Sequence, residues 1–247
     1  MIEQLWKEYA EKKDEQIRDQ LIIACLPYVK STAQRLSIYA NSAQDTDDLI
    51  NAGIIGLMDA IEKYDPSKGA SFKSYAQHRI RGSIMDEIRS MDWVPYSTRE
   101  KARKIEKIYA EFEHNGNKEP IEEEIASALG MTLDQYYEIL LEINRMSISL
   151  LDDIFHNDDE IAGDDDNSTD PEKELLMTET EALVGEAIEK LPEKERLVIT
   201  LYYYEEMTMK DIGKVINVTE SRVCQLHSSA ILRLHAKLKH AGMGIRV

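Results

Sequence analysis

The side chains best placed to do chemistry in this sequence are aromatic and cationic groups that suit unpaired nucleic acid. Phe72, Tyr75 and Arg79 lie three and four residues apart, so a helix would carry them on one face. Aromatic rings stack on exposed bases and cations meet phosphates. Further polar and cationic side chains follow in the same segment: His78, Arg81 and Arg89. Core positions for both rings fit the same spacing, so nucleic-acid binding and ordinary packing stay open as equal alternatives.

A second candidate site for nucleic acid lies at residues 208–229, which have the pattern of a helix-turn-helix. Asn217 stands at the turn, where its tolerance of a left-handed backbone is useful, and Gly213 is small where the second helix approaches the first. A recognition helix reads the major groove with polar side chains near its start. The residues of those types are Thr219, Glu220, Ser221, Arg222, Gln225, His227, Ser228 and Ser229. The combination favours DNA binding over an ordinary helical hairpin with a polar face.

A third pattern predicts a surface that docks on another protein. Asp48, Asn51, Ile54 and Met58 recur along one stripe of the helix expected from Asp47 to Tyr64. A core stripe would be purely apolar, and a solvent stripe would not carry Ile and Met. The mixture of polar and apolar side chains therefore favours a protein interface.

The distribution of charge supports contact with nucleic acid, although the net charge of −17 argues against it at first sight. Residues 152–174 hold eleven acidic side chains and one lysine, which is −10 of that total. Residues 68–104 hold nine basic and four acidic side chains, and residues 207–247 hold seven basic and two acidic ones. Two basic modules thus flank an acidic connector, and this regional charge is more informative than the sum.

The elements that position these groups are all predicted to be helices, because helix-forming residues dominate and regularly spaced strand segments are absent. Thr46 is the expected N-cap of the helix from Asp47 to Tyr64, and Ser97 with Glu100 is expected to form a capping box. Gly53 and Gly56 permit close packing of helices. Up to the acidic tract, helices are expected at Leu21–Tyr39, Asp47–Tyr64, Phe72–Met91, Ser97–Glu113, Ile121–Leu129 and Thr132–Met146.

The C-terminal part is expected to hold about four helices. One ends near Lys190, one runs from Leu191-Pro192 through Tyr204, and Thr208 and Thr219 open the last two. The predicted fold class is all-α, with three small helical modules and a helix-turn-helix on an acidic tether. The expected boundaries are 1–94, 95–150 and 179–247, with residues 151–178 as the linker.

Several classes of site are not expected. Cys25 and Cys224 lie far apart in apolar stretches and predict buried free thiols in a reducing compartment. The carboxylates of the acidic tract lack the spacing of a calcium loop, so no metal site is expected. No apolar run is long enough to span a membrane, and no secretory leader precedes the chain. We expect a cytoplasmic protein with no cofactor and no catalytic residues.

Several segments resemble the bacterial sigma-70 family of RNA polymerase sigma factors. Residues 48–60 (DLINAGIIGLMDA) are similar to its core-polymerase-binding helix, and residues 72–76 (FKSYA) to its promoter-melting segment. Residues 79–89 (RIRGSIMDEIR) and 92–95 (DWVP) resemble the flagellar/WhiG, or FliA-type, alternative subgroup. The match covers nearly the whole chain, with regions 2, 3 and 4 in order and no long region 1.

The resemblance implies a role for each set of residues. Asp48, Asn51, Ile54 and Met58 would contact the clamp coiled coil of the polymerase β′ subunit, and the C-terminal module would meet the β flap. The surface for −10 recognition and melting would comprise Phe72, Tyr75, His78, Arg79, Arg81 and Arg89. Arg99 and Arg103 would contact the extended −10 region, and residues 219–229 would read the −35 element. The acidic tract would enter the active-site channel, and an anti-sigma factor is an expected partner.

Two departures from the family pattern restrict which of these implied roles apply to this chain. Primary sigma factors carry a Trp pair where this chain has His78-Arg79, so melting here does not rest on two indoles. Tyr96 stands where the subgroup usually has Arg after the W-V-P sequence.

A stand-alone helix-turn-helix regulator is one competing hypothesis, but it leaves residues 47–89 unexplained. A Mg²⁺-dependent nucleic-acid enzyme is another, but its carboxylates would lie in the linker instead of on rigid elements.

Overall fold

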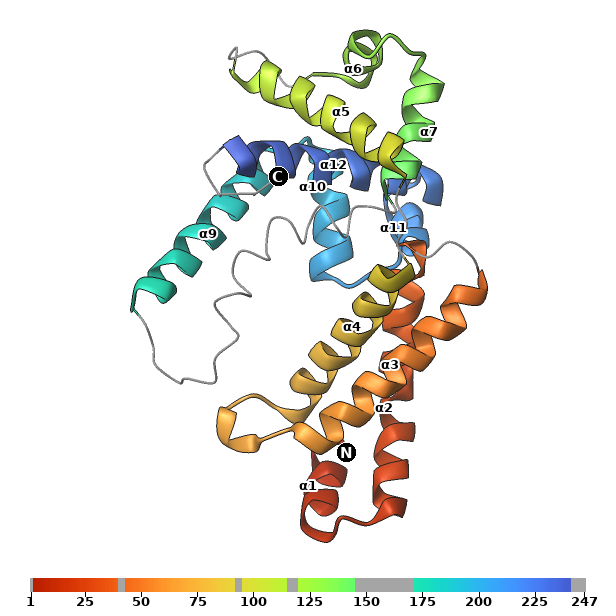
Figure 1. The fold of residues 1–247 in the computed structure, drawn as a ribbon, viewed down its shortest axis with the longest axis vertical. Helices are drawn as coiled ribbons and strands as arrows, with labels where there is room; N and C mark the ends of the chain where they lie inside the picture. Colours follow the sequence, from red (N-terminus) through yellow and green to blue (C-terminus); the bar gives the residue numbers. More distant parts are fainter. Residues whose placement is uncertain (1, 40–42, 92–94, 115–119, 145–170, 241–247) are drawn as a thin grey trace. The chain divides into compact units, whose positions relative to one another are not determined.

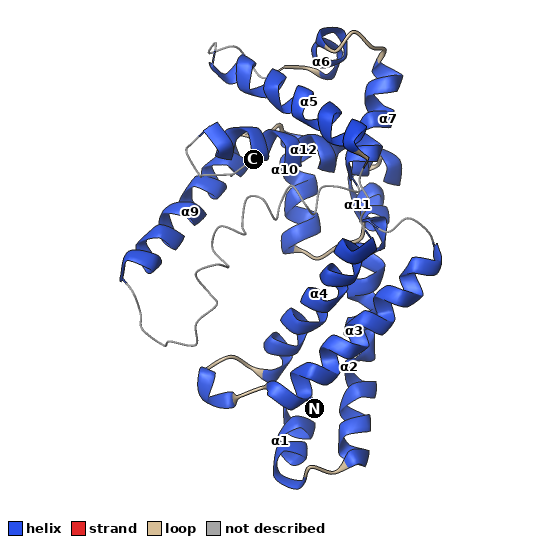
Figure 2. Cartoon of the chain, in the orientation of Figure 1, coloured by secondary structure: helices blue, strands red, loops and turns tan. Residues whose placement is uncertain are grey.

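The computed structural model describes residues 2–39, 43–91, 95–114, 120–144 and 171–240. Within these residues the chain forms helices and turns and no strand (Figure 2), which confirms the all-α prediction. The chain divides into two compact units, residues 1–93 (unit 1) and residues 94–247 (unit 2). The acidic tract that the sequence assigns to a linker lies mostly outside the described residues. Its last part, from Pro171, is helical.

The described residues of unit 1 form four helices and two short 3-10 turns (Figure 1). The helices are α1 (Ile2–Lys12), α2 (Glu15–Leu36), α3 (Ala43–Lys63) and α4 (Phe72–Met91), and the turns are Ser37–Tyr39 and Pro66–Lys68. α3 makes its most extensive contacts with α4 and also packs on α2. The core of the unit is therefore the space shared by α2, α3 and α4.

Two glycines allow α3 to approach its neighbours closely. A Cβ atom on Gly53 would lie 2.8 Å from Cγ1 of Val29, and one on Gly56 would lie 2.7 Å from the carbonyl oxygen of Arg79. The hydroxyl of Ser83 on α4 donates a hydrogen bond of 2.8 Å to the Ala52 carbonyl on α3. Close backbone contact of this kind leaves no room for a side chain at Gly56, as the sequence predicted.

Some helix starts differ from the predictions. α3 begins at Ala43, so Thr46 lies inside the helix and is not its N-cap. α5 begins at Tyr96, so Ser97 is a helical residue and does not open a capping box. The predicted cap at Thr132 is confirmed, because its hydroxyl accepts from the Gln135 amide at 3.3 Å and the Gln135 side chain accepts from the Thr132 amide at 2.9 Å. Local capping signals thus locate a helix end within a few residues.

Unit 2 surrounds its last helix with the others. It contains α5 (Tyr96–His114), α6 (Glu122–Ala128), α7 (Leu133–Asn144), α9 (Pro171–Glu189), α10 (Glu193–Ile199), a π-helical turn (Thr200–Tyr204), α11 (Met209–Ile216) and α12 (Glu220–His240). α12 packs against α5, α7, α9, α10 and α11. Its residues from Leu226 to Ala236 are all buried, so this helix is the axis of the unit's core.

Both cysteines are free thiols, and burial raises the pKa of each to about 11. Cys25 is buried as predicted, whereas Cys224 on α12 is only half-buried. A thiol with a raised pKa is mostly protonated near neutral pH and is a poor nucleophile or metal ligand. Among the described helices, none combines the length and the apolar character needed to cross a membrane.

Candidate nucleic-acid interface

The predicted docking stripe on α3 is largely open to solvent. Asp48, Asn51 and Met58 are exposed and Ile54 is half-buried. Ile55, which was not among the predicted residues, is 65% exposed and adds to the apolar area beside Met58, which is 40% exposed. A large apolar side chain in solvent next to polar groups is typical of a surface that another protein covers.

Phe72, by contrast, is a core residue. Its side chain is fully buried and its ring lies 5.9 Å from that of Trp6 and 5.4 Å from that of Tyr64. The amide of Lys73 donates to the Glu3 carboxylate at 3.0 Å, so α1 holds the start of α4. In this arrangement the Phe72 ring has no face left for a base. The Phe72 ring therefore packs in the core beneath the predicted DNA-binding surface of α4 and does not form part of that surface.

Tyr75 is the aromatic residue of α4 that reaches the surface. It is half-buried, and its ring lies 5.5 Å from the ring of Tyr64, whose hydroxyl donates to the Ala70 carbonyl at 2.6 Å. Tyr64 and Trp6 complete this aromatic cluster and were not predicted from the sequence. The spacing of aromatic residues within α4 could not reveal them, because they come from α3's C-terminal end and from α1.

The other side chains of α4 that were predicted to contact DNA are open to solvent. His78, Arg79, Arg81 and Arg89 are all exposed. The Arg79 guanidinium is bound by the carboxylate of Asp59, and Arg89 pairs with Asp86 at 2.9 Å within its own helix. Arg99 and Arg103, one turn apart on α5 of unit 2, are also exposed. Each of the positions predicted for phosphate contact is thus open to solvent.

The helix-turn-helix geometry of α11 and α12 is confirmed. Asn217 adopts the left-handed conformation (φ 56°, ψ 49°), and a Cβ atom on Gly213 would lie 2.8 Å from the Val218 carbonyl oxygen. The hydroxyl of Thr208 caps α11 by accepting from the Asp211 amide at 3.2 Å. That of Thr219 accepts from the Arg222 amide, also at 3.2 Å. Thr219, Glu220 and Ser221 are exposed at the start of α12.

Arg222, the cation of this predicted reading face, is engaged by the first half of unit 2. Its Nη2 atom lies 2.9 Å from both carboxylate oxygens of Glu122, at the start of α6. Its guanidinium also lies 4.9 Å from the ring centre of Tyr137, whose hydroxyl donates to Glu122 at 2.6 Å. Gln225 accepts a further hydrogen bond at 3.3 Å. A carboxylate therefore occupies the place where an anionic or guanine partner would meet Arg222.

His227, Ser228 and Ser229 are buried inside unit 2, so in this arrangement they cannot reach base edges. Nδ1 of His227 lies 3.1 Å from the Asn144 side-chain oxygen and Nε2 lies 3.0 Å from the Tyr203 hydroxyl. Burial lowers the pKa of His227 to about 3, which keeps the ring neutral. The Ser229 hydroxyl donates to Glu195 at 2.9 Å. These three residues bind α12 to its neighbours.

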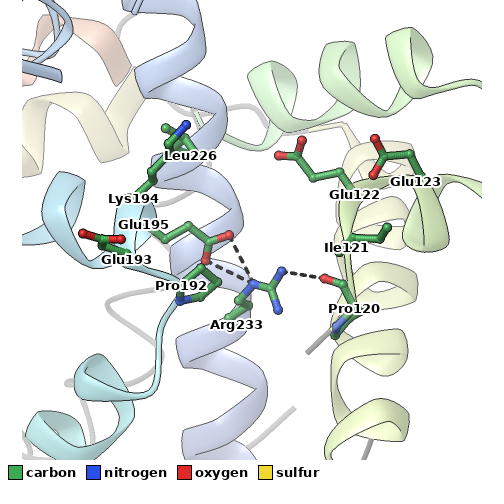
Figure 3. A pocket seen from close by; sticks show the side chains of 10 residues that line it. All are labelled: Pro120, Ile121, Glu122, Glu123, Pro192, Glu193, Lys194, Glu195, Leu226 and Arg233. Atoms are coloured by element: carbon green, nitrogen blue, oxygen red, sulfur yellow. Dashed lines mark hydrogen bonds and ion pairs between the residues drawn. The ribbon is translucent and has the colours of Figure 1, made fainter. Parts of the chain in front are cut away.

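A buried ion pair continues this contact along α12. Arg233 lies 3.1 Å from Glu195, donates to the Pro120 carbonyl at 3.1 Å, and lies 4.3 Å above the Tyr109 ring. Figure 3 shows this arginine on the wall of a cavity of about 630 Å³ between the starts of α6 and α10. Within the described residues, no cluster of His, Cys, Asp and Glu could hold a metal ion.

Three comparisons agree with this geometry. Three protein families match the chain: Sigma-70 region 2 at residues 21–94, Sigma-70 region 3 at residues 100–175 and Sigma-70 region 4 at residues 187–236. The RNA polymerase sigma factor FliA of Escherichia coli K12 is 43% identical over 86% of this chain and 90% of its own length. The RNA polymerase sigma-D factor of Bacillus subtilis is 36% identical over 93% and 92%.

A solved structure resembles the chain as well. The complex entitled flagellar sigma/anti-sigma complex, Sigma-28/FlgM, gives a TM-score of 0.56 at 34% identity and covers 90% of this chain and 95% of that one. The exposed α3 stripe, the aromatic and cationic α4 and the helix-turn-helix fall in matched regions 2 and 4. The chain therefore belongs to the sigma-70 family, and it is an alternative sigma factor of the flagellar FliA type that directs RNA polymerase to promoters.

Proposed function

We propose that unit 1 supplies both the polymerase-docking surface and the promoter-melting surface. The observation that carries this proposal is the packing of α3 on α4. The two helices are packed closely at Gly56, so an exposed stripe of mixed polarity and a half-buried tyrosine among arginines share one rigid body. In this proposal Asp48, Asn51, Ile54 and Met58 bind the β′ clamp coiled coil. Tyr75 and its cationic neighbours act on the −10 strand once docking has positioned it.

Promoter reading upstream is assigned to unit 2. The exposed start of α12, with Thr219, Glu220 and Ser221, reads the −35 element together with Arg222 and Gln225, and Arg99 and Arg103 contact the extended −10 region. Arg222 cannot read DNA while Glu122 holds it, so binding to core polymerase, including the β flap, must release it. His227, Ser228 and Ser229 keep the helix in place in this proposal and do not read bases.

The same assignment implies the chain's partners. The solved structures that it resembles contain FlgM, so an anti-sigma protein of that type is the proposed inhibitory partner. The chain acts as a binding subunit in the cytoplasm, where core polymerase is found, and the polymerase performs the catalysis. The acidic residues from 152 onward are proposed to enter the polymerase channel in place of nucleic acid.

Reconstituted transcription tests the function. Core polymerase is incubated with the purified chain and with a supercoiled template that carries a FliA-type promoter. We expect transcripts to begin at that promoter only when the chain is present, and FlgM added before core polymerase to suppress them. A folded chain that binds core polymerase without giving initiation at that promoter would contradict the assignment.

A further inference from the structure

Asp59 on α3 binds the guanidinium of Arg79 on α4. Nε of Arg79 donates to Oδ2 of Asp59 at 3.1 Å, and Nη2 donates to the same oxygen. The other carboxylate oxygen lies 2.7 Å from Nζ of Lys63. The Asp59 side chain is 24% exposed and the Arg79 side chain 47% exposed. Two cations therefore share one half-buried carboxylate, and the three groups together carry one positive charge.

The close helix contact explains why this pair forms. Gly56 lies against the Arg79 backbone, where a Cβ atom would be 2.7 Å from the carbonyl oxygen. Asp59 follows Gly56 by three residues, so it lies on the same face of α3 about one turn further on. The backbone approach at Gly56 thus brings the Asp59 carboxylate within reach of the Arg79 side chain.

Arg79 is also adjacent to the aromatic surface. It follows Tyr75 by four residues, so both project from the same side of α4. Tyr75 is steadied by Tyr64, and Arg79 by Asp59. A ring held by Tyr64, just after α3, and a guanidinium held by Asp59 on α3 therefore project from the same side of α4.

We propose that Asp59 is a positioning residue for the DNA contact of Arg79. The carboxylate holds the guanidinium along the α3–α4 edge and offsets its charge, so Arg79 meets the strand in one orientation and favours particular bases. An unrestrained arginine would instead move freely among phosphates, which are the same for every sequence. The inference rests on the proposed assignment of α4 to the −10 strand, and it adds a residue that does not itself touch DNA.

The Asp59→Asn variant tests this in the holoenzyme, with single-stranded oligonucleotides that cover the −10 segment of the promoter used above. We expect the slope of log K against log salt to become steeper by about 0.7, because one more cation engages phosphate. We also expect discrimination between the parent sequence and single-base variants to fall about twofold to fivefold, the range expected for losing a partly exposed ion pair. Glu62→Gln, which removes the same charge from the neighbouring exposed position, should change neither quantity.

A double-mutant cycle with Arg79→Ala decides whether Asp59 acts through Arg79. If it does, Asp59→Asn has no effect on discrimination in the Arg79→Ala background, where any remaining change in slope comes from Lys63, which shares the carboxylate. An equal effect on discrimination in both backgrounds overturns the inference, and so does a variant that lowers the melting temperature without changing slope or discrimination. If Arg79→Ala itself leaves oligonucleotide binding unchanged, the assignment of α4 to the −10 strand fails first, so the two failures are distinguishable.

Discussion

At the scale of single residues, the two aromatic side chains of α4 have opposite roles. Phe72 is fully buried among rings, whereas Tyr75 is half-buried at the surface. A helix with aromatic residues three apart gives no local signal of this difference, because the identity of each neighbour depends on α1 and α3. The sequence therefore predicted the helix from Phe72 to Met91 correctly but could not say which ring faces solvent.

Tyr75→Ala should impair promoter opening while leaving stability nearly unchanged. Stacking on an unpaired base contributes about 1–3 kcal/mol, and it acts only after docking. Permanganate reactivity of −10 thymines should fall, and a premelted template should restore activity. Phe72→Ala is the matched comparison: removing a buried ring costs about 3–5 kcal/mol of folding free energy, visible as an earlier urea transition. Loss of stability in both variants, with no rescue by premelting, would place Tyr75 in the core as well.

His227 makes stability depend on pH. Its pKa is about 3 in the folded chain and 6.5 ordinarily, so between these values only the unfolded chain binds the proton. This contribution to stability is complete above pH 6.5 and is lost as pH falls. At pH 5.5 the free energy of unfolding is lower by about 1.4 kcal/mol because of this residue. The free energy of unfolding measured in urea should therefore fall less between pH 7.5 and 5.5 for His227→Gln than for the parent chain. A drop in His227→Gln as large as that of the parent would contradict this role of the ring.

At the scale of elements, local signals located the helix-turn-helix well. Asn217, Gly213, Thr208 and Thr219 all occupy the positions predicted for them, because each acts on backbone within a few residues. The partner of Arg222 was not foreseeable in the same way. Glu122 is 100 positions away, and nothing near either residue marks the pair. Long-range packing decides which side chains of a polar face remain available.

The exposed stripe on α3 should be tested as an element, since no single side chain dominates it. Asp48→Ala combined with Asn51→Ala should weaken association with core polymerase by about tenfold or more, as two polar contacts of about 1 kcal/mol each are lost. Because both residues are exposed, the circular dichroism spectrum should not change. Fluorescence titration with labelled core measures the affinity, and Glu62→Ala on the same helix is the control. An unchanged affinity in the folded double variant removes the stripe from the interface.

At the scale of the whole molecule, the proposal predicts that the isolated chain binds promoter duplex poorly and that the holoenzyme binds it tightly. Glu122→Gln should increase binding of the free chain to −35 duplex by about fivefold, because a partly exposed ion pair contributes about 1 kcal/mol. The holoenzyme, in which Arg222 is already released, should be unaffected. Gel-shift titrations of both forms measure this, with Glu123→Gln as the neighbouring control of equal charge. Tight, specific binding by the free parent chain would refute the occlusion.

The contact between Glu122 and Arg222 also affects how promoter occupancy depends on the concentration of the chain. Because the two residues belong to one chain, Glu122 competes with DNA as a tethered ligand, so the fraction of chains in which Arg222 is occluded does not depend on the concentration of the chain. With the ion pair worth about 1 kcal/mol, the apparent affinity of the free chain for a promoter is about fivefold lower than that of a chain without the contact. Higher abundance therefore offsets the contact only in proportion, whereas release of Arg222 on core polymerase removes it. Occupancy would follow the supply of core polymerase.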